Sequence, residues 1–241
     1  SEPNIVINTA VAEVLGEFAD RLEGLSGKAL EAEIHLLLKE VLRDHRHIVF
    51  NGNGYTSEWV EEAHKRGLFD LPSCAEAFPR LIAEKNVELF LKHGIYTKEE
   101  LFSRYEIKEE NYIKTINIEA KTMIDMASKQ IIPAVVKYTT QLASSLTAVR
   151  TACEEADVSV QKELLLETSD KLSEMKVALA ALKDILAKAS AIKDNKEKAF
   201  AYLHEVCPAM VALRKPADEL EMLVDKELWP FPSYGDLVFE V

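Results

Sequence analysis

Two histidines separated by one residue, His45 and His47, are the first side chains whose chemistry could matter, because imidazole nitrogens are common metal ligands. Residues two apart point to different sides of a helix, although they share one face of a strand. The pair has no third ligand beside it in the sequence and no HExxH spacing. The pattern therefore favours the polar end of a helix, where cationic side chains suit the helix dipole, over a metal site.

A second candidate is the run Asn51-Gly52-Asn53-Gly54-Tyr55, since glycines let backbone amides come close to a phosphate group. The run matches neither GxGxxG after a clear strand nor the GxxxxGK[ST] loop of nucleotide-binding proteins. A doubled Asn-Gly is instead a strong turn signal. We expect a turn here rather than a phosphate-binding loop.

Adjacent glutamates could supply general acid–base catalysis, which needs two carboxylates in one cleft with separated pKa values. Neighbouring residues on a helix point apart, so solvated helix faces are the favoured interpretation. The four pairs are Glu61-Glu62, Glu99-Glu100, Glu109-Glu110 and Glu154-Glu155.

The three cysteines, Cys74, Cys153 and Cys207, are far apart and have no paired histidine in a recognisable motif. Free cysteine most often behaves as a small buried hydrophobe, so we expect structural thiols. An odd number of separated cysteines also suits a reducing cytoplasm. The methionines follow helical stripes and are interpreted as core residues: Met123, Met126, Met175, Met210 and Met222. The polar residues thus predict no catalytic residue, no cofactor-binding residue and no metal ligand in this chain.

The most distinctive segment is Trp229-Pro230-Phe231-Pro232-Ser233-Tyr234, near the end of the chain. Its two prolines disfavour helix, and its aromatic rings carry a large apolar surface. The favoured interpretation is a tail that packs across other helices, and the alternative is docking to another domain or subunit. The residues that we predict for docking are Trp229, Phe231, Tyr234, Leu172 and Leu179.

The elements that would position these residues are dominated by one long predicted helix, residues 109–153, with apolar or small residues at alternating steps of three and four. At 1.5 Å per residue it would span roughly 65 Å, so it needs partners along its length. Pro133 removes one backbone donor in its middle. A kink near residues 129–132 is expected rather than a stop, because the apolar stripe continues in phase.

Two further long helices supply those partners. Residues 159–191 carry a heptad seam from Leu165 to Leu186, and residues 196–227 carry a stripe that Pro208 and Pro216 should bend. Three consecutive helices with short connections predict an antiparallel bundle. Before them, residues 1–23 and 28–47 predict a pair of antiparallel helices. The first has one apolar face, made of Ile7, Val11, Val14, Leu15, Phe18 and Leu22. Shorter helices are expected over 58–66, 75–93 (with a possible break at Pro79) and 98–104. Ser73 with Glu76 and Thr97 with Glu100 have capping-box spacing at the starts of the last two. The predicted fold is all-α, with a short-helix region over 1–104 and the bundle with its tail over 105–241.

The composition excludes several functional classes. The net charge of −12 argues against nucleic acid or an anionic membrane as partner, since both attract clustered Lys and Arg. No apolar run approaches the 18 residues that a transmembrane helix needs. The chain starts at Ser1 and its first methionine is Met123, so we expect a processed or truncated product.

Four segments together resemble one family. They are PNIVINTAVAE (3–13), IVFNGNGYTSEWVEEAHKRGL (48–68), NYIKTINIEAKTMIDMASKQIIPAV (111–135) and ADELEMLVDKELWPFPSYGDLVF (217–239). All are similar to the C-terminal part of type III glutamine synthetase, the large-subunit bacterial form of the ATP-dependent glutamate–ammonia ligase. The resemblance implies that the metal-binding glutamates, the nucleotide loop and the glutamate-binding arginines lie upstream, in a catalytic domain that this sequence does not contain.

The leading hypothesis is therefore a non-catalytic, cytoplasmic helical module with a structural or assembly role in a synthetase that uses ATP and Mg²⁺ or Mn²⁺. Region 1–104 would join the missing catalytic domain, and the expected partners are the remainder of the synthetase and its sister subunits. One alternative is a free-standing helical interaction module that uses the seam from Leu165 to Leu186. Another is a small-molecule enzyme centred on His45, His47 and the Asn-Gly loop.

Overall fold

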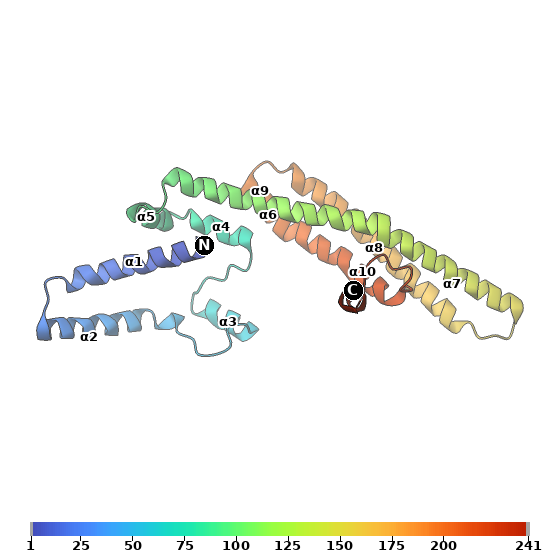
Figure 1. Ribbon diagram of the computed structural model, residues 1–241, viewed down its shortest axis with the longest axis horizontal. Helices are drawn as coiled ribbons and strands as arrows, with labels where there is room; N and C mark the ends of the chain where they lie inside the picture. Colours follow the sequence, from blue (N-terminus) through green and yellow to red (C-terminus); the bar gives the residue numbers. More distant parts are fainter. Residues whose placement is uncertain (1, 240–241) are drawn as a thin grey trace. The chain divides into compact units, whose positions relative to one another are not determined.

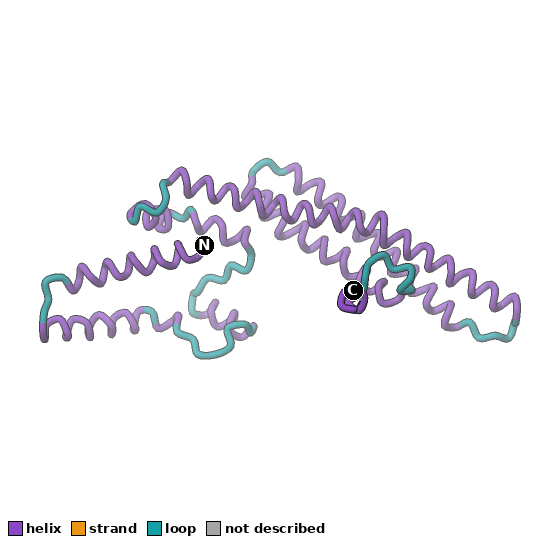
Figure 2. Tube along the Cα trace, viewed as in Figure 1, coloured by secondary structure: helices purple, strands orange, loops and turns teal. Residues whose placement is uncertain are grey.

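The computed structural model describes residues 2–239, apart from the side chain of Tyr234, and within that range all regular secondary structure is helical. The expectation of an all-α fold is confirmed (Figure 2). The chain divides into two compact units, Ser1–Glu106 and Ile107–Val241, and the division falls inside helix α6 (Lys98–Met126). No helix in the described range has the length and apolarity that crossing a bilayer requires.

Helix α6 differs from the prediction, which separated a short helix over 98–104 from a long one that began at residue 109. The residues between them, Tyr105 to Lys108, contain no glycine or proline, so nothing local ends the helix. Leu101, Tyr105 and Ile113 are all buried along it, so the apolar stripe runs through without a gap. The start of α6 is capped as predicted, because Thr97 Oγ1 accepts a hydrogen bond from Glu100 N at 3.1 Å.

The second unit is a bundle in which α8 (Ser159–Ala191) is the central helix. It packs against α7 (Ile132–Ala152) and also against α10 (Cys207–Leu223), and consecutive helices run in opposite directions (Figure 1). At 33 residues, α8 is about 50 Å long. Its predicted seam is its buried face, with Met175, Leu179 and Leu182 between 0% and 1% exposed. The predicted antiparallel bundle is therefore present.

Tyr202 connects three segments of this bundle through its hydroxyl group. The side chain is 1% exposed, its hydroxyl donates to Asn117 Oδ1 at 3.2 Å, and it lies 3.1 Å from Ser190 Oγ. Asn117 belongs to α6 and Ser190 to α8. A buried hydroxyl with two partners fixes how these segments pack without leaving a polar group unsatisfied.

Two prolines of the bundle lie just after a widened, π-helical turn. The first turn, η2 (Ala127–Ile131), is followed by Pro133 at the start of α7. The second, η3 (Tyr202–Val206), lies between α9 (Asn195–Ala201) and α10 and is followed by Pro208. Proline has no N–H and crowds the carbonyl four residues earlier, and a wider turn relieves both conflicts. The irregularity predicted near 129–132 is thus a π-turn within a continuous helical path.

The third predicted helix ends earlier than residue 227. Helix α10 stops at Leu223, and a turn follows in which Asp225 O accepts from Leu228 N at 2.9 Å and from Trp229 N at 3.0 Å. Pro216 lies inside α10 and is buried, and the helix continues past it to Leu223. A short helix, α11 (Tyr234–Phe239), comes after the two tail prolines. Ser233 and Asp236 cap its first turn reciprocally, with Asp236 Oδ2 accepting from Ser233 N at 2.7 Å.

The first unit is built from shorter helices and a smaller core. Val87, Phe90, Tyr96 and Leu101 form this core, with Leu81 and Ile82 packed against it. The helices that precede α6 are α1 (Glu2–Leu22), α2 (Gly27–Asp44), the 3₁₀ turn η1 (Arg46–Ile48), α3 (Ser57–Lys65), α4 (Cys74–Leu81) and α5 (Glu84–Lys92).

Local signals explain where these helices begin and end. The predicted capping box of Ser73 and Glu76 opens α4, and Gly94 takes the left-handed conformation just after α5, with a φ of 62°. Pro79 lies within α4, so the predicted break in 75–93 falls at Ile82 and Ala83 instead. The second helix is also shorter than predicted and ends at Asp44.

Candidate functional site

The polar clusters singled out in the sequence do not converge on one site. His45 and His47 lie at the 3₁₀ turn after α2 with their ring centroids 6.4 Å apart. Within residues 2–239, no group of three His, Cys, Asp or Glu side chains is arranged to hold a metal ion. The two imidazoles lie just beyond the end of α2, in the turn that follows it.

The Asn-Gly loop is a turn ordered by its own side chains. Asn53 Oδ1 accepts a hydrogen bond from Tyr55 N at 3.0 Å. Phe50 stacks on Trp59 with centroids 3.9 Å apart, and the Arg66 guanidinium lies 5.5 Å from the centre of the Trp59 ring. These contacts tie the loop to α3, and the expected turn is present at residues 54–55.

Three of the four glutamate pairs include a carboxylate with a single basic partner one helical turn away. Glu62 pairs with Arg66 at 2.7 Å, and Glu110 pairs with Lys114 at 2.7 Å; Glu100 and Arg104 form the third pair. Such i,i+4 pairs are typical of solvated helix faces. Glu109 departs from the prediction because it is only 3% exposed.

Two sulfur-containing sets also depart from the prediction of buried core residues. Cys74 and Cys153 are exposed, whereas Cys207 is partly buried and burial raises the pKa of its thiol. Met175 is fully buried, but Met222 is 85% exposed. Met222 lies near the end of α10, and its position in the helical repeat places it on the outer face of that helix. The amino-acid composition alone does not show this exposure.

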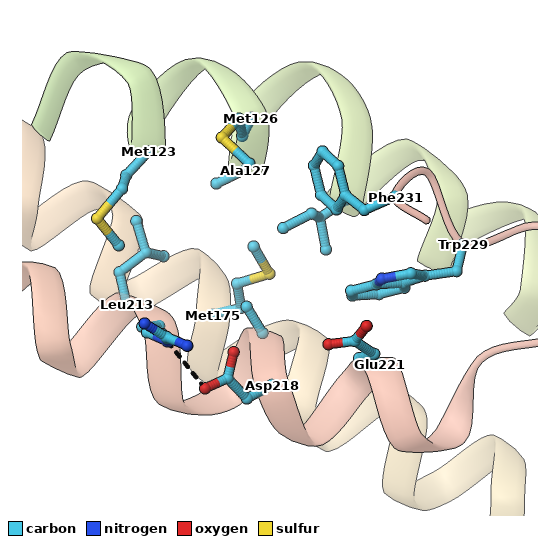
Figure 3. A pocket seen from close by; sticks show the side chains of 12 residues that line it. Met123, Met126, Ala127, Met175, Leu213, Asp218, Glu221, Trp229 and Phe231 are labelled. Carbon is cyan, nitrogen blue, oxygen red and sulfur yellow. Dashed lines mark hydrogen bonds and ion pairs between the residues drawn. The ribbon is translucent and has the colours of Figure 1, made fainter. Parts of the chain in front are cut away.

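The aromatic tail packs across the bundle in the second unit. Trp229 and Phe231 are partly buried, have centroids 6.3 Å apart at a steep interplanar angle, and line a cavity with residues of α6, α8 and α10. Figure 3 shows both rings pointing toward Met126, Ala127 and Met175. The tail therefore covers apolar surface of its own unit. The side chain of Tyr234 lies outside the described residues, so its predicted docking role stays a prediction.

The other two predicted docking residues lie on the seam of α8. Leu179 is 1% exposed and belongs to the core of the bundle, and Leu172 is partly buried. The seam is thus occupied by helices of the same chain. Docking of another molecule at these positions stays a prediction, and it would require the bundle to open.

An apolar surface on α1 is left open in the first unit, and the sequence alone did not predict it. The predicted face of this helix includes Ile7, Val11, Val14 and Leu15, and these side chains are 43–60% exposed. Together with Ala10 they line an open apolar groove. The stripe was visible in the sequence, but it was expected to pack against the second helix.

Polar contacts, in contrast, hold α1 in its own unit. Thr9, on the opposite side of α1, is 4% exposed, and Glu13 on that side accepts hydrogen bonds from Lys92 Nζ and pairs with His93 Nε2, both at 2.6 Å. The Lys92 ammonium and then the His93 imidazole lower the pKa of the Glu13 carboxyl. Helix α1 therefore turns its polar side toward α5 and its apolar side outward.

Ion pairs also join α1 to α2. The Arg21 guanidinium donates to Glu33 Oε1 and to Glu40 Oε2, both at 2.6 Å. Leu38 and Leu42 of α2 are 50% and 66% exposed, so the hairpin forms as predicted but leaves apolar residues of both helices in solvent. Monomeric proteins rarely leave contiguous apolar surface exposed in this way without a partner that covers it.

Comparisons with known proteins give a consistent picture. Residues 33–150 match the family model described as the glutamine synthetase C-terminal domain. A glutamine synthetase of Butyrivibrio fibrisolvens is 37% identical over 221 residues, which is 92% of this chain and 32% of that protein. A glutamine synthetase of Bacteroides fragilis is 32% identical, and a type-3 glutamine synthetase of Dictyostelium discoideum is 33% identical; each match covers 98% of this chain. The chain spans about a third of the length of these relatives.

Proposed function

We propose that the chain belongs to the family of glutamine synthetase C-terminal domains and is the non-catalytic helical module of a longer synthetase, with a structural role in assembly. The reaction of the parent enzyme, the ATP-dependent ligation of ammonia to glutamate, would then be carried out by the two-thirds of the relatives' length that this chain does not match. ATP and Mg²⁺ or Mn²⁺ would bind in that part, and the whole protein would work in the cytoplasm.

The observation that carries this proposal is the outward apolar face of α1. A helix that binds its own unit through Glu13 and turns Ile7, Val11 and Leu15 outward has one packed face and one apolar face left for a partner. Burial of a large apolar side chain contributes about 1.5–3 kcal/mol, so covering this groove would supply a substantial part of a docking energy. The occupant that we propose is the catalytic part of the same synthetase chain.

The proposal is tested in the synthetase that carries this chain. Replacing both Val11 and Leu15 by Asp places two charges in the proposed contact, where burying an unpaired carboxylate is costly. We expect the module to lose its contact with the catalytic part, and the subunit contacts that depend on this docking to weaken. The oligomer should then dissociate, as measured by light scattering, and γ-glutamyl transferase activity should fall with it. The matched control is Ala19→Asp, which adds a charge at an exposed position of α1 outside the groove.

Two further measurements complete the test. The 241-residue chain alone is expected to show no biosynthetic or transferase activity with Mg²⁺ or Mn²⁺. Deletion of these residues from the synthetase is expected to disrupt assembly. An oligomer that stays intact after the deletion, or after the double substitution, would refute the assembly role.

A further inference from the structure

The bundle contains a cavity of about 290 Å³ that the proposed structural role does not use. It lies within the second unit, between α6, the π-turn η2, α8, α10 and the aromatic tail (Figure 3). Its wall is mainly apolar and includes Met123, Met126, Met175 and Phe231. A dry apolar cavity of about 150 Å³ is large enough to bind benzene, so this one has room for a fused bicyclic molecule.

The space exists because of two local features of the sequence. The π-turn widens the helix at Ala127 and Ile131, which both line the cavity, and π-turns recur at functional sites. Small side chains, Ala127 and Ala217, lie on facing walls where larger residues would fill the gap. The methionines are flexible side chains that adapt to guests of different shape.

One hydrogen-bond donor in the wall lacks an acceptor. The Nε1–H group of Trp229 is buried and has no hydrogen-bond partner within the described part of the chain. Buried indole N–H groups ordinarily find a partner, because a lost hydrogen bond in a buried site is costly. Figure 3 shows the indole nitrogen on the edge of the ring that is turned toward Phe231. A guest would satisfy it by placing an acceptor between the indole edge and Phe231, which requires the Phe231 ring to move aside.

The mouth of the cavity carries an excess of negative charge. Arg214 is paired with Asp218 at 3.1 Å, which leaves the Glu221 carboxylate as the uncompensated charge among the lining residues. Acidic groups at the entrance disfavour an anionic ligand.

We propose that this cavity is a binding site for a small, uncharged, largely apolar molecule of bicyclic size whose carbonyl or ether oxygen accepts a hydrogen bond from Trp229 Nε1. The apolar body lies against the methionines and Phe231. The acceptor, and not size alone, distinguishes the ligand from other apolar molecules.

The test uses three probes with the same bicyclic frame: 1-indanone, which has a carbonyl acceptor; indane, which lacks it; and indane-2-carboxylate, which is anionic. The readout is the indole N–H resonance of Trp229 in ¹H–¹⁵N spectra of the chain, assigned with Trp59→Phe because the sequence has only two tryptophans. We expect 1-indanone to shift this resonance downfield with a Kd on the order of 0.1–1 mM. Indane should bind about fivefold more weakly, as loss of one hydrogen bond predicts, and the carboxylate more weakly still.

Matched variants locate the site. Ala217→Met fills the cavity from α10 and should abolish the shift, whereas Ala212→Met, at an exposed position of the same helix outside the cavity, should leave it unchanged. Far-UV circular dichroism checks that both variants keep their helix content. The proposal is overturned if 1-indanone and indane bind equally well, if no probe moves the Trp229 resonance at about 1 mM, or if Ala217→Met still binds.

Discussion

The two units of this chain use amphipathic helices in opposite ways. In the second unit, α8 turns its apolar seam toward α7 and α10, and Met175 and Leu182 are completely buried. In the first unit, α1 turns polar residues toward α5, and its apolar residues Ile7 and Leu15 are 60% and 58% exposed to solvent. An apolar stripe thus predicts a helix and the face of it that will be packed. It does not predict whether the packing partner belongs to the same unit or to another one.

The sharpest test of this difference compares one leucine from each unit. Leu182→Ala removes fully buried methyl groups and should lower the free energy of unfolding of the second unit by about 2–5 kcal/mol. Leu15→Ala removes an exposed side chain and should cost less than about 0.5 kcal/mol. Urea unfolding followed by tryptophan fluorescence separates the units, because Trp59 lies in the first and Trp229 in the second.

Equal costs at the two positions would contradict the comparison. That result would mean that the α1 face is already covered in solution, for example by a second copy of the chain. Repeating the measurement over a range of protein concentrations separates this case from burial within one molecule.

A smaller effect concerns two glycines of the first unit that lie in different backbone conformations. Gly94 has a φ of 62° at the end of α5, so Gly94→Ala should destabilise this unit by about 1–2 kcal/mol. Gly16 lies in the middle of α1 with no atom within 4 Å of an added Cβ, so Gly16→Ala should stabilise it by about 0.5–1 kcal/mol. Thermal unfolding followed by Trp59 fluorescence checks the direction of both changes in stability. A loss of stability in Gly16→Ala would mean that a partner packs against α1 at this position.

The smallest expected effect is a pH dependence at the tail of the second unit. The Lys226 ammonium, the Ser233 amide and the Ser233 hydroxyl lower the pKa of Asp236 from 3.8 to about 2. A carboxyl whose pKa is lowered by folding adds stability that is fully present above pH 3.8 and is lost as the pH falls toward 2. Trp229 fluorescence should therefore change in this window, and Asp236→Asn should remove the change. If the fluorescence change between pH 3.8 and pH 2 persists in Asp236→Asn, another carboxyl group is responsible for it.

Much of the bundle could be predicted from the sequence because its information is local. The periodic stripes of α8 and α10 and the cap at Asp194 depend on residues within a few turns of each other. The end of α10 at Leu223 was missed, since it depends on how the following turn folds back. The exposure of Met222 was missed although its helical phase, two residues after Leu220, already places it off the buried stripe.

The candidate surfaces were harder to predict than the elements. The stripe of α1 has the same period whether its partner is α2 or another domain, so sequence reasoning assigned it to the hairpin. The ion pairs of Arg21 and the contacts of Glu13 decide the orientation, and they join residues 12 to 80 positions apart in the chain. The cavity beside Trp229 depends on the exact width of the helix at η2, which a proline signals but does not define.

Each π-turn can also be regarded as a tolerated insertion. A π-turn holds one residue more than the α-helical turn that it replaces, and one residue rotates an α-helix by about 100°. Removing a single residue from Ala127–Ile131 would therefore rotate α7 about its axis. Its buried residues Ala134, Val135 and Leu142 would then no longer face α8. Pro133 and the extra residue before it therefore depend on each other, because losing either one alone disturbs the packing of the bundle. We expect relatives of this chain to have both features or neither.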